Sequence, residues 1–246
     1  MTAIDVSARF AVARPDASHP YRRPVDAATL ILIDRSARTP RVLLGRRNPA
    51  QKFMPGKLVF PGGRVDPQDR NVPVYGMLDS VSERRLQERV VRPSLSRARA
   101  LALAAIRETC EETGLVIGSR EAGAPDAMPA GWEAFAQAGA FPNLEALSFV
   151  ARAVTPPGLS RRFDTRFFMA DAAEIAHRLP DVVGPQSELV ELAWLTLTEA
   201  KKAEVPTITH AILEEVETRL AGGNKPWLPV PYYVTRHGRM MREALE

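Results

Sequence analysis

The chain has 246 residues, of which 45% are hydrophobic and 25% charged, and these proportions are ordinary for a soluble globular protein. They exclude a disordered chain and a collagen-like fibre, and a single cysteine, Cys110, excludes an intrachain disulfide. The net charge of +4 comes from basic residues scattered in pairs, so we expect no nucleic-acid surface. No apolar run reaches the roughly 18 residues of a membrane-spanning helix, and the N-terminus carries no apolar signal core. We therefore expect a cytoplasmic protein.

An irregular, proline-punctuated lead-in over residues 1–26 precedes the predicted elements. Apolar β-branched runs and alternating patterns predict strands at 28–34, 41–47, 57–60, 147–154, 163–170 and 188–197. Helical periodicity and end signals predict helices near 77–91, at 96–113, near 131–138 and at 206–220. The first two strands form a predicted hairpin, and Pro61-Gly62-Gly63 is a predicted turn that ends the third strand.

Strands mixed with helices, without regular βαβ alternation, favour an α+β or α/β sandwich with a mixed sheet. We expect one elaborated domain over residues 27–220. Residues 221–246 form a tail that we expect to pack on this domain.

The end of the predicted helix at 96–113 is the most informative segment. Glu108, Glu111 and Glu112 fall within an arc of roughly 100° on one helix face. Like charges at these spacings cost roughly 0.2–0.5 kcal/mol per pair, and the helix dipole disfavours negative charge at this end. Arg107 can pair with Glu111 one turn further on. The segment is either a solvated acidic face or a site for Mg²⁺ or Mn²⁺, which bind carboxylate oxygens and share substrate phosphates.

Together with Phe60-Pro61-Gly62-Gly63, this segment resembles the Nudix hydrolase signature G-x5-E-x7-R-E-U-x-E-E-x-G-U, in which U is a bulky aliphatic residue. The first glycine matches Gly63, and the second half matches Arg107, Glu108, Glu111, Glu112, Gly114 and Leu115. The resemblance covers most of residues 27–200. It implies a Nudix-type α/β/α sandwich with a mixed sheet.

The chain departs from this signature at three points. Between Gly63 and Arg107 lie 43 residues where the signature has 13, which implies an insertion at about 70–96, either a substrate-facing loop or an exterior element. The acidic position after the glycine is Asp69, and the aliphatic position after Arg-Glu is Thr109.

The segment before the glycines resembles one branch of the family. A basic residue ahead of G-x-V-x-F-P-G-G is typical of coenzyme A and acyl-coenzyme A diphosphatases. Here Lys52 precedes Gly56-Lys57-Leu58-Val59-Phe60-Pro61-Gly62-Gly63, with lysine in place of the usual arginine and leucine in place of the first valine.

The resemblance implies hydrolysis of a diphosphate linked to another moiety, with Mg²⁺ or Mn²⁺ as cofactor. Glu108 and Glu112 would be the principal metal ligands, and Glu111 would be a further ligand or would orient water. The Gly62 carbonyl would be a backbone ligand, and Arg107 would steady the cluster.

A distal carboxylate often completes such a site or acts as the base. Glu188 and Glu191, which precede Trp194, are the candidates. The spacing to the tryptophan favours Glu188. The alternative is a solvated residue at the start of a strand.

Basic side chains would hold the phosphates, since arginine makes bidentate contacts and lysine supplies a point charge. The candidates are Arg46, Arg47, Lys52, Lys57, Arg161, Arg162 and Arg166. Lys52 and Lys57 rank first because they flank the branch motif, and Gly63 permits a close approach of the backbone.

The favoured reaction converts coenzyme A or acyl-coenzyme A to 3′,5′-ADP and (acyl)phosphopantetheine. Nucleotide sugars, dinucleoside polyphosphates and NADH are alternative substrates, and a non-catalytic ligand-binding module is an alternative function. The expected partner is a small-molecule diphosphate, with neither a nucleic acid nor a membrane. The sequence is compatible with a homodimer.

Overall fold

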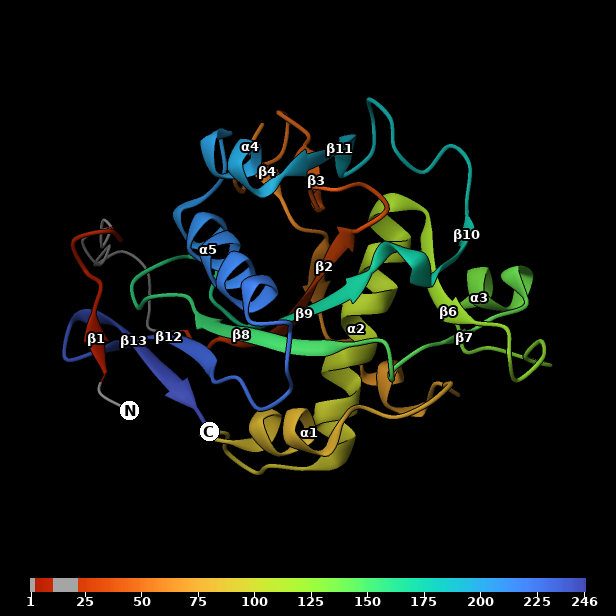
Figure 1. The fold of residues 1–246 in the computed structure, drawn as a ribbon, viewed down its shortest axis with the longest axis horizontal. Helices are drawn as coiled ribbons and strands as arrows, with labels where there is room; N and C mark the ends of the chain where they lie inside the picture. The colour runs from red at the N-terminus through yellow and green to blue at the C-terminus, as the bar shows by residue number, and fades with distance from the viewer. Residues whose placement is uncertain (1–2, 11–21) are drawn as a thin grey trace.

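The computed structural model describes residues 3–10 and 22–246, and in this part of the chain ten strands form one mixed sheet (Figure 1). Its main path runs β1-β13-β12-β8-β9-β2-β3-β11, and β4 and β5 attach to β3 and β2. The strands are β1 (Ile4–Asp5), β2 (Val25–Asp34), β3 (Arg41–Arg47), β4 (Leu58–Val59), β5 (Gly62–Arg64), β8 (Ser148–Val154), β9 (Phe163–Asp171), β11 (Leu189–Thr196), β12 (Val230–Arg236) and β13 (Arg239–Leu245). A smaller sheet contains β10 (Ile175–Arg178), β6 (Leu115–Ser119) and β7 (Phe141–Pro142).

The helices cover both faces of the main sheet. They are α1 (Ser80–Gln87), α2 (Leu95–Thr113), α3 (Glu133–Ala138), α4 (Leu197–Lys202) and α5 (Thr207–Ala221), with short 3₁₀ turns η1 (Pro67–Asn71) and η2 (Ala172–Glu174). Within the described residues, no helix has the length and apolar character needed to cross a bilayer.

Strand β2 separates two hydrophobic cores. Because successive side chains of a strand point to opposite faces, Leu30 and Leu32 pack in the core with α2, whereas Ile31 and Ile33 pack in the core with α5. A strand buried on both faces has a continuous apolar run, which is why 28–34 was a clear signal. The α/β/α sandwich with a mixed sheet is therefore confirmed.

The helix that carries the three glutamates forms where its end signals predict. The Ser94 hydroxyl accepts a hydrogen bond from the backbone N–H of Arg97, and Gly114 ends the helix in the left-handed conformation at φ 74°. Only glycine adopts this conformation at little cost. Between these ends, nine residues of α2 have buried apolar side chains, mostly alanine and leucine.

The sheet opens between β2 and β3, and this opening places the site. The two strands pair directly only at Ile33–Val42 and Asp34–Arg41. Beyond these pairs, β5 adds to the edge of β2 and β4 adds to the edge of β3. The segment around Pro61 thereby bridges the opening and carries Gly62 and Gly63 next to the C-terminal half of α2.

Three predictions from sequence differ from the structure. Pro61-Gly62-Gly63 is not a simple turn, because Gly62 and Gly63 start strand β5, paired with Thr29 and Ala28 of β2. The helix expected near 77–91 is shorter, with Asp79 as its N-cap and its end at Gln87. The lead-in over 1–26 contains strand β1, and its residues 1–2 and 11–21 lie outside the described residues.

The tail after residue 221 contributes to the sheet. Strands β12 and β13 form a hairpin, and β12 pairs in parallel with β8 through Tyr232 and Tyr233. The two-residue loop is His237-Gly238, and both residues have positive φ, 49° and 78°. This conformation matches the right-handed twist of the flanking strands.

Candidate active site

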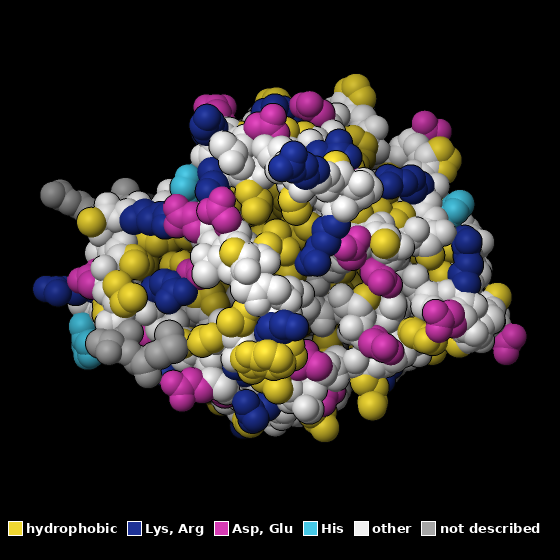
Figure 2. All heavy atoms as spheres, viewed as in Figure 1, with side chains coloured by type: hydrophobic (Ala, Val, Ile, Leu, Met, Phe, Trp, Pro, Cys, Tyr) yellow, Lys and Arg dark blue, Asp and Glu magenta, His cyan; other side chains and the backbone are white. Residues whose placement is uncertain are grey.

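A cleft of about 450 Å³ opens on the α5 side of the sheet, where β2 and β3 diverge. In Figure 2 the middle of this face is hollowed and exposes hydrophobic side chains, with basic and acidic side chains near the hollow. The charged residues that line the cleft are Arg47, Arg64, Glu108, Glu112, Arg161 and Glu188. Its apolar wall includes Phe53, Met54, Phe60, Phe163, Phe167 and Ile208.

Glu112 lies at the inner end of the cleft. It is buried, and its Oε2 accepts a hydrogen bond of 3.0 Å from the backbone N–H of Gly62. The pKa of Glu112 is raised to about 8, mainly by burial and also by the carboxylates of Glu188 and Glu108, whereas the Gly62 N–H and Arg47 oppose the shift. A carboxylate with so little compensation is one that a bound cation would stabilise.

Glu108 lies one helical turn before Glu112. Its side chain is 17% exposed, and burial is the main cause of its raised pKa, against the lowering effect of Arg107. Gly63 lies against it so closely that a Cβ at position 63 would overlap the Glu108 carboxyl group. The glycine therefore makes room for this carboxylate rather than for a sharp turn.

Arg107 links the signature helix to the segment after the glycines. Its Nε donates to Asp69 at 2.9 Å, and its Nη1 donates to Glu108 at 2.9 Å and to Glu111 at 3.1 Å. Its Nη2 donates to the backbone carbonyl of Arg64 at 2.8 Å. The Arg107–Glu111 pair is confirmed, and Arg107 holds β5 and α2 together.

The two residues that depart from the signature both satisfy their polar groups internally. Asp69 is fully buried, binds Arg107 and completes a capping box with the backbone N–H of Asp66. Thr109 is fully buried, and its hydroxyl donates to the carbonyl of Ala105 at 2.7 Å. Neither residue lines the cleft.

Glu188 reaches the same cleft from the other side of the opening, at the start of β11. Its carboxylate pairs with Arg47 Nη2 at 2.9 Å. Arg47 also donates from Nε to the Phe53 carbonyl at 2.9 Å and contacts Gln51. Glu191 does not line the cleft and instead binds Arg46, with an Nε–Oε2 distance of 2.8 Å.

The predicted substrate-binding residues divide into two groups. Arg161 and Gly63 line the cleft together with Gly62. Lys52, Lys57 and Arg46 do not line it, and Lys57 lies 3.6 Å from Glu204. Their assignment to substrate stays a prediction.

The glutamate cluster, which we define as Glu108, Glu112 and Glu188, fits a hard divalent cation by its chemistry. All three carboxylates line one cleft, and burial raises the pKa values of Glu108 and Glu112. Within the described residues, however, no three or more acidic, histidine or cysteine side chains lie together in an arrangement that could hold a metal ion as they stand. Glu111 lies outside the cleft lining, with its carboxylate on Arg107. A cation would thus be held first by Glu108 and Glu112.

Sequence reasoning missed the apolar wall and Arg64. Phe53 and Phe163 approach edge to face, with ring centroids 6.3 Å apart, although 110 positions separate them along the chain. Met54 has a positive φ of 50°, unusual for a residue with a side chain. No local sequence pattern identifies such a wall. Arg64, in contrast, directly follows the matched glycine, and this position could have identified it as a residue of the site.

Similar proteins are found by comparison of structures and not by comparison of sequences. No protein-family model and no curated protein match the sequence. The chain is similar to the crystal structure of a NUDIX hydrolase from Alicyclobacillus acidocaldarius, with a TM-score of 0.56 and 28% identity over 78% of this chain and 90% of that chain. Weaker likenesses include a C. elegans Ap4A hydrolase (TM-score 0.44, 17% identity, 80% and 98% covered) and the NUDIX domain of Shewanella oneidensis NrtR complexed with ADP ribose (0.44, 14%, 89% and 99%).

The Alicyclobacillus structure, the sandwich fold and the glutamates of α2 agree with one another. They support the Nudix superfamily for this chain and define an enzyme of the Nudix hydrolase class. The general reaction of this class is hydrolysis of a diphosphate.

Proposed function

We propose that the protein hydrolyses the diphosphate of coenzyme A or acyl-coenzyme A, with Mg²⁺ or Mn²⁺, to 3′,5′-ADP and (acyl)phosphopantetheine. The observation that carries the hydrolytic part is the pair of glutamates on α2, Glu108 and Glu112, in the cleft beside Gly62-Gly63. The likeness of residues 52–63 to the coenzyme A branch favours this substrate.

The cleft offers complementary groups to each part of such a molecule. The carboxylates of Glu108 and Glu112 lie where a cation would neutralise them, and Arg47, Arg64 and Arg161 supply positive charge for phosphate oxygens. The apolar wall with Phe53 and Phe163 suits an organic moiety attached to the diphosphate.

The chain's own residues account for binding, orientation and proton transfer. Gly62 donates its N–H to Glu112 and orients that carboxylate, and Arg107 orients Glu108. Glu188, which is about half exposed and paired with Arg47, is our candidate for the base that accepts a proton from the attacking water. A bound Mg²⁺ or Mn²⁺ would neutralise charge on the diphosphate oxygens and activate water for attack.

A panel of diphosphates tests the substrate. Coenzyme A, acetyl-coenzyme A, a nucleotide sugar, a dinucleoside polyphosphate and NADH are each incubated with Mg²⁺ or Mn²⁺, and the products are separated by chromatography. We expect 3′,5′-ADP from coenzyme A. Cleavage of another member of the panel without cleavage of coenzyme A contradicts the substrate but not the hydrolase.

The variant Glu112→Gln tests whether the measured hydrolysis is due to this protein rather than to a contaminating enzyme. Because the substitution removes a buried charge next to the reacting diphosphate, we expect activity to fall about a hundredfold or more. Glu217→Gln, on the exposed side of α5 and paired with Lys201, is the matched control and is expected to keep full activity. No turnover of any panel member by wild type contradicts the enzyme and favours the ligand-binding module.

A further inference from the structure

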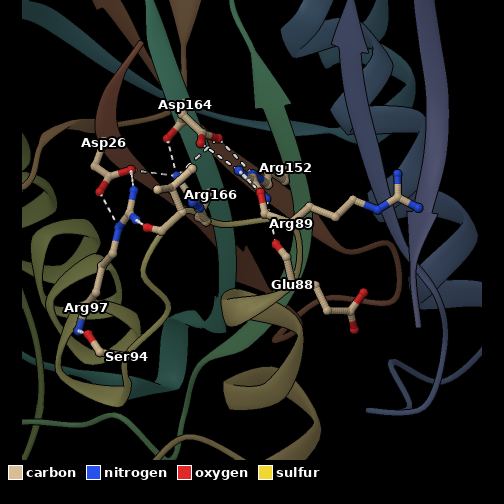
Figure 3. Close-up of polar contacts among 9 residues, drawn as sticks. Asp26, Glu88, Arg89, Ser94, Arg97, Arg152, Asp164 and Arg166 are labelled. Atoms are coloured by element: carbon tan, nitrogen blue, oxygen red, sulfur yellow. Dashed lines mark hydrogen bonds and ion pairs between the residues drawn. The ribbon is translucent and has the colours of Figure 1, made fainter. Parts of the chain in front are cut away.

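A second cluster of charged side chains lies on the opposite face of the sheet from the cleft, beneath the start of α2. We call it the arginine cluster, and it contains Arg97, Arg152 and Arg166 with Asp26 and Asp164 (Figure 3). These residues come from β2, α2, β8 and β9. None of them lines the cleft.

Each aspartate of the cluster is shared between two arginines. Asp26 accepts hydrogen bonds from Arg97 at 2.7 and 2.8 Å and from Arg166 Nη1 at 3.0 Å. Asp164 accepts from Arg152 at 2.8 and 2.7 Å and lies 3.1 Å from Arg166 Nη1. Arg152 also stacks over the Tyr232 ring, 4.5 Å from its centroid.

Arg166 is the least satisfied member of the cluster. Its side chain is fully buried, and all of its contacts, including the 2.8 Å bond to the Asp164 carbonyl, use Nη1. Its Nε and Nη2 are buried without a hydrogen-bond partner. Its parallel-strand neighbour on β2 is Ala28, which is too small to cover a guanidinium and offers no side-chain acceptor.

The charges of the cluster do not balance. Three guanidinium groups face two carboxylates, so one positive charge is in excess within the cluster. Figure 3 shows the Glu88 carboxylate pointing away from the cluster, and only the Glu88 carbonyl takes part, at 3.0 Å from Arg152. Arg89 pairs with Glu243 instead. No further carboxylate among the described residues contacts Arg166.

Guanidinium N–H groups without an acceptor are expensive in the interior, because burial removes water without supplying a partner. Burial lowers the pKa of Arg166, Asp164 counteracts this effect, and Arg152 adds to it. A buried water would accept one of the two free N–H groups but would leave the excess charge. An anion would accept hydrogen bonds from the free N–H groups and would also balance the excess charge.

We propose that a small inorganic anion of halide size binds beside Arg166 and accepts hydrogen bonds from its Nε and Nη2. The anion brings the cluster to three positive and three negative charges. It thereby fastens α2 to strands β2, β8 and β9 at the end of the helix away from the glutamates.

Crystals of the protein grown with sodium bromide in place of sodium chloride test this site directly. We expect an anomalous bromide peak within hydrogen-bonding distance of Arg166 Nε and Nη2. An ordered water without anomalous signal, or no density at this position, overturns the proposal. Neither result depends on hydrolytic activity, so failure here is distinguishable from failure of the proposed function.

Thermal unfolding gives a second test in solution. At constant ionic strength we expect the melting temperature to be a few degrees higher in chloride or bromide than in gluconate. Gluconate serves as the reference because it is too large to enter a buried site. Arg166→Met is expected to abolish this difference, and Arg239→Met, an exposed arginine on β13, is expected to keep it. Equal melting temperatures in halide and gluconate for wild type contradict the proposal.

Discussion

The glutamate cluster and the arginine cluster involve opposite ends of α2 and have opposite charge imbalances. In the first, Glu108 accepts a hydrogen bond from Arg107 and Glu112 accepts one from the Gly62 N–H, and Arg47 also stabilises the charge of Glu112. In the second, three arginines share two aspartates. Each cluster is incomplete as a set of protein groups alone.

The difference between them lies in access. Glu108 and Glu112 line an open cleft with a half-exposed carboxylate, Glu188, across from them, so a cation and its substrate can enter and leave. Arg166 is fully buried, so its counter-ion would be retained. An uncompensated charge in a cleft indicates reactivity, whereas the same imbalance in the interior indicates a structural ion.

The largest effect that we expect comes from Arg107→Met. The substitution leaves Asp69, which is fully buried, without its cationic partner, and such losses cost about 3–5 kcal/mol. Chemical denaturation measures the change in the free energy of unfolding. Arg120→Met, which removes an arginine bonded only to the Ala138 carbonyl, is the control, and equal stability of the two variants would contradict the role of Arg107.

Asp164→Asn breaks the other cluster. It removes one of two carboxylates that serve three arginines, and we expect a loss of about 2–4 kcal/mol. Added halide should restore more stability to this variant than to wild type. A variant as stable as wild type in gluconate would show that Asp164 does not compensate the arginines.

Gly63→Ala tests the geometry of the cleft without removing a charge. A Cβ there would displace the Glu108 carboxylate, and a small misplacement of a reacting group costs about tenfold in rate or more. Because the displaced atoms are the end of a flexible side chain, we expect the melting temperature to change little. A drop in stability with unchanged activity would contradict this assignment.

The dependence of stability on pH tests the burial of the Glu112 carboxylate. In metal-free protein the pKa of Glu112 is raised by burial from 4.5 to about 8, so the folded state holds this proton more tightly than the unfolded state. The stabilisation is complete below pH 4.5 and is lost as the pH rises to about 8. We expect the melting temperature to fall over this range in wild type, and Glu112→Gln to flatten the fall. Identical profiles would contradict the burial of this charge.

The sequence predicted those parts of the molecule whose signals are local. The helix expected at 96–113 spans Leu95–Thr113, and the strands expected at 147–154 and 163–170 span Ser148–Val154 and Phe163–Asp171. A strand that is buried on both faces has a continuous apolar run, and a helix that is buried on one face has a periodic apolar pattern. The His237-Gly238 hairpin also has a local signal, a glycine in a two-residue turn.

The remaining features depend on contacts between distant segments. Strand β5 exists because Gly62 and Gly63 pair with β2 more than 30 residues earlier, and glycines alone predict only a turn. Arg166 was a candidate for phosphate binding, but it points into the arginine cluster, away from the cleft. Side chains alternate between the two faces of the sheet along β9, so Thr165 and Phe167 line the cleft whereas Arg166 points to the other face. The sequence alone does not show which face carries the cleft.

The central claim is that Glu108 and Glu112 bind the divalent cation on which diphosphate hydrolysis depends. Titration of metal-free protein with Mn²⁺, followed by electron paramagnetic resonance of the free ion, measures this most directly. We predict a bound ion in wild type and in Glu217→Gln, and binding at least tenfold weaker in Glu112→Gln. Equal affinity in wild type and Glu112→Gln would contradict the account.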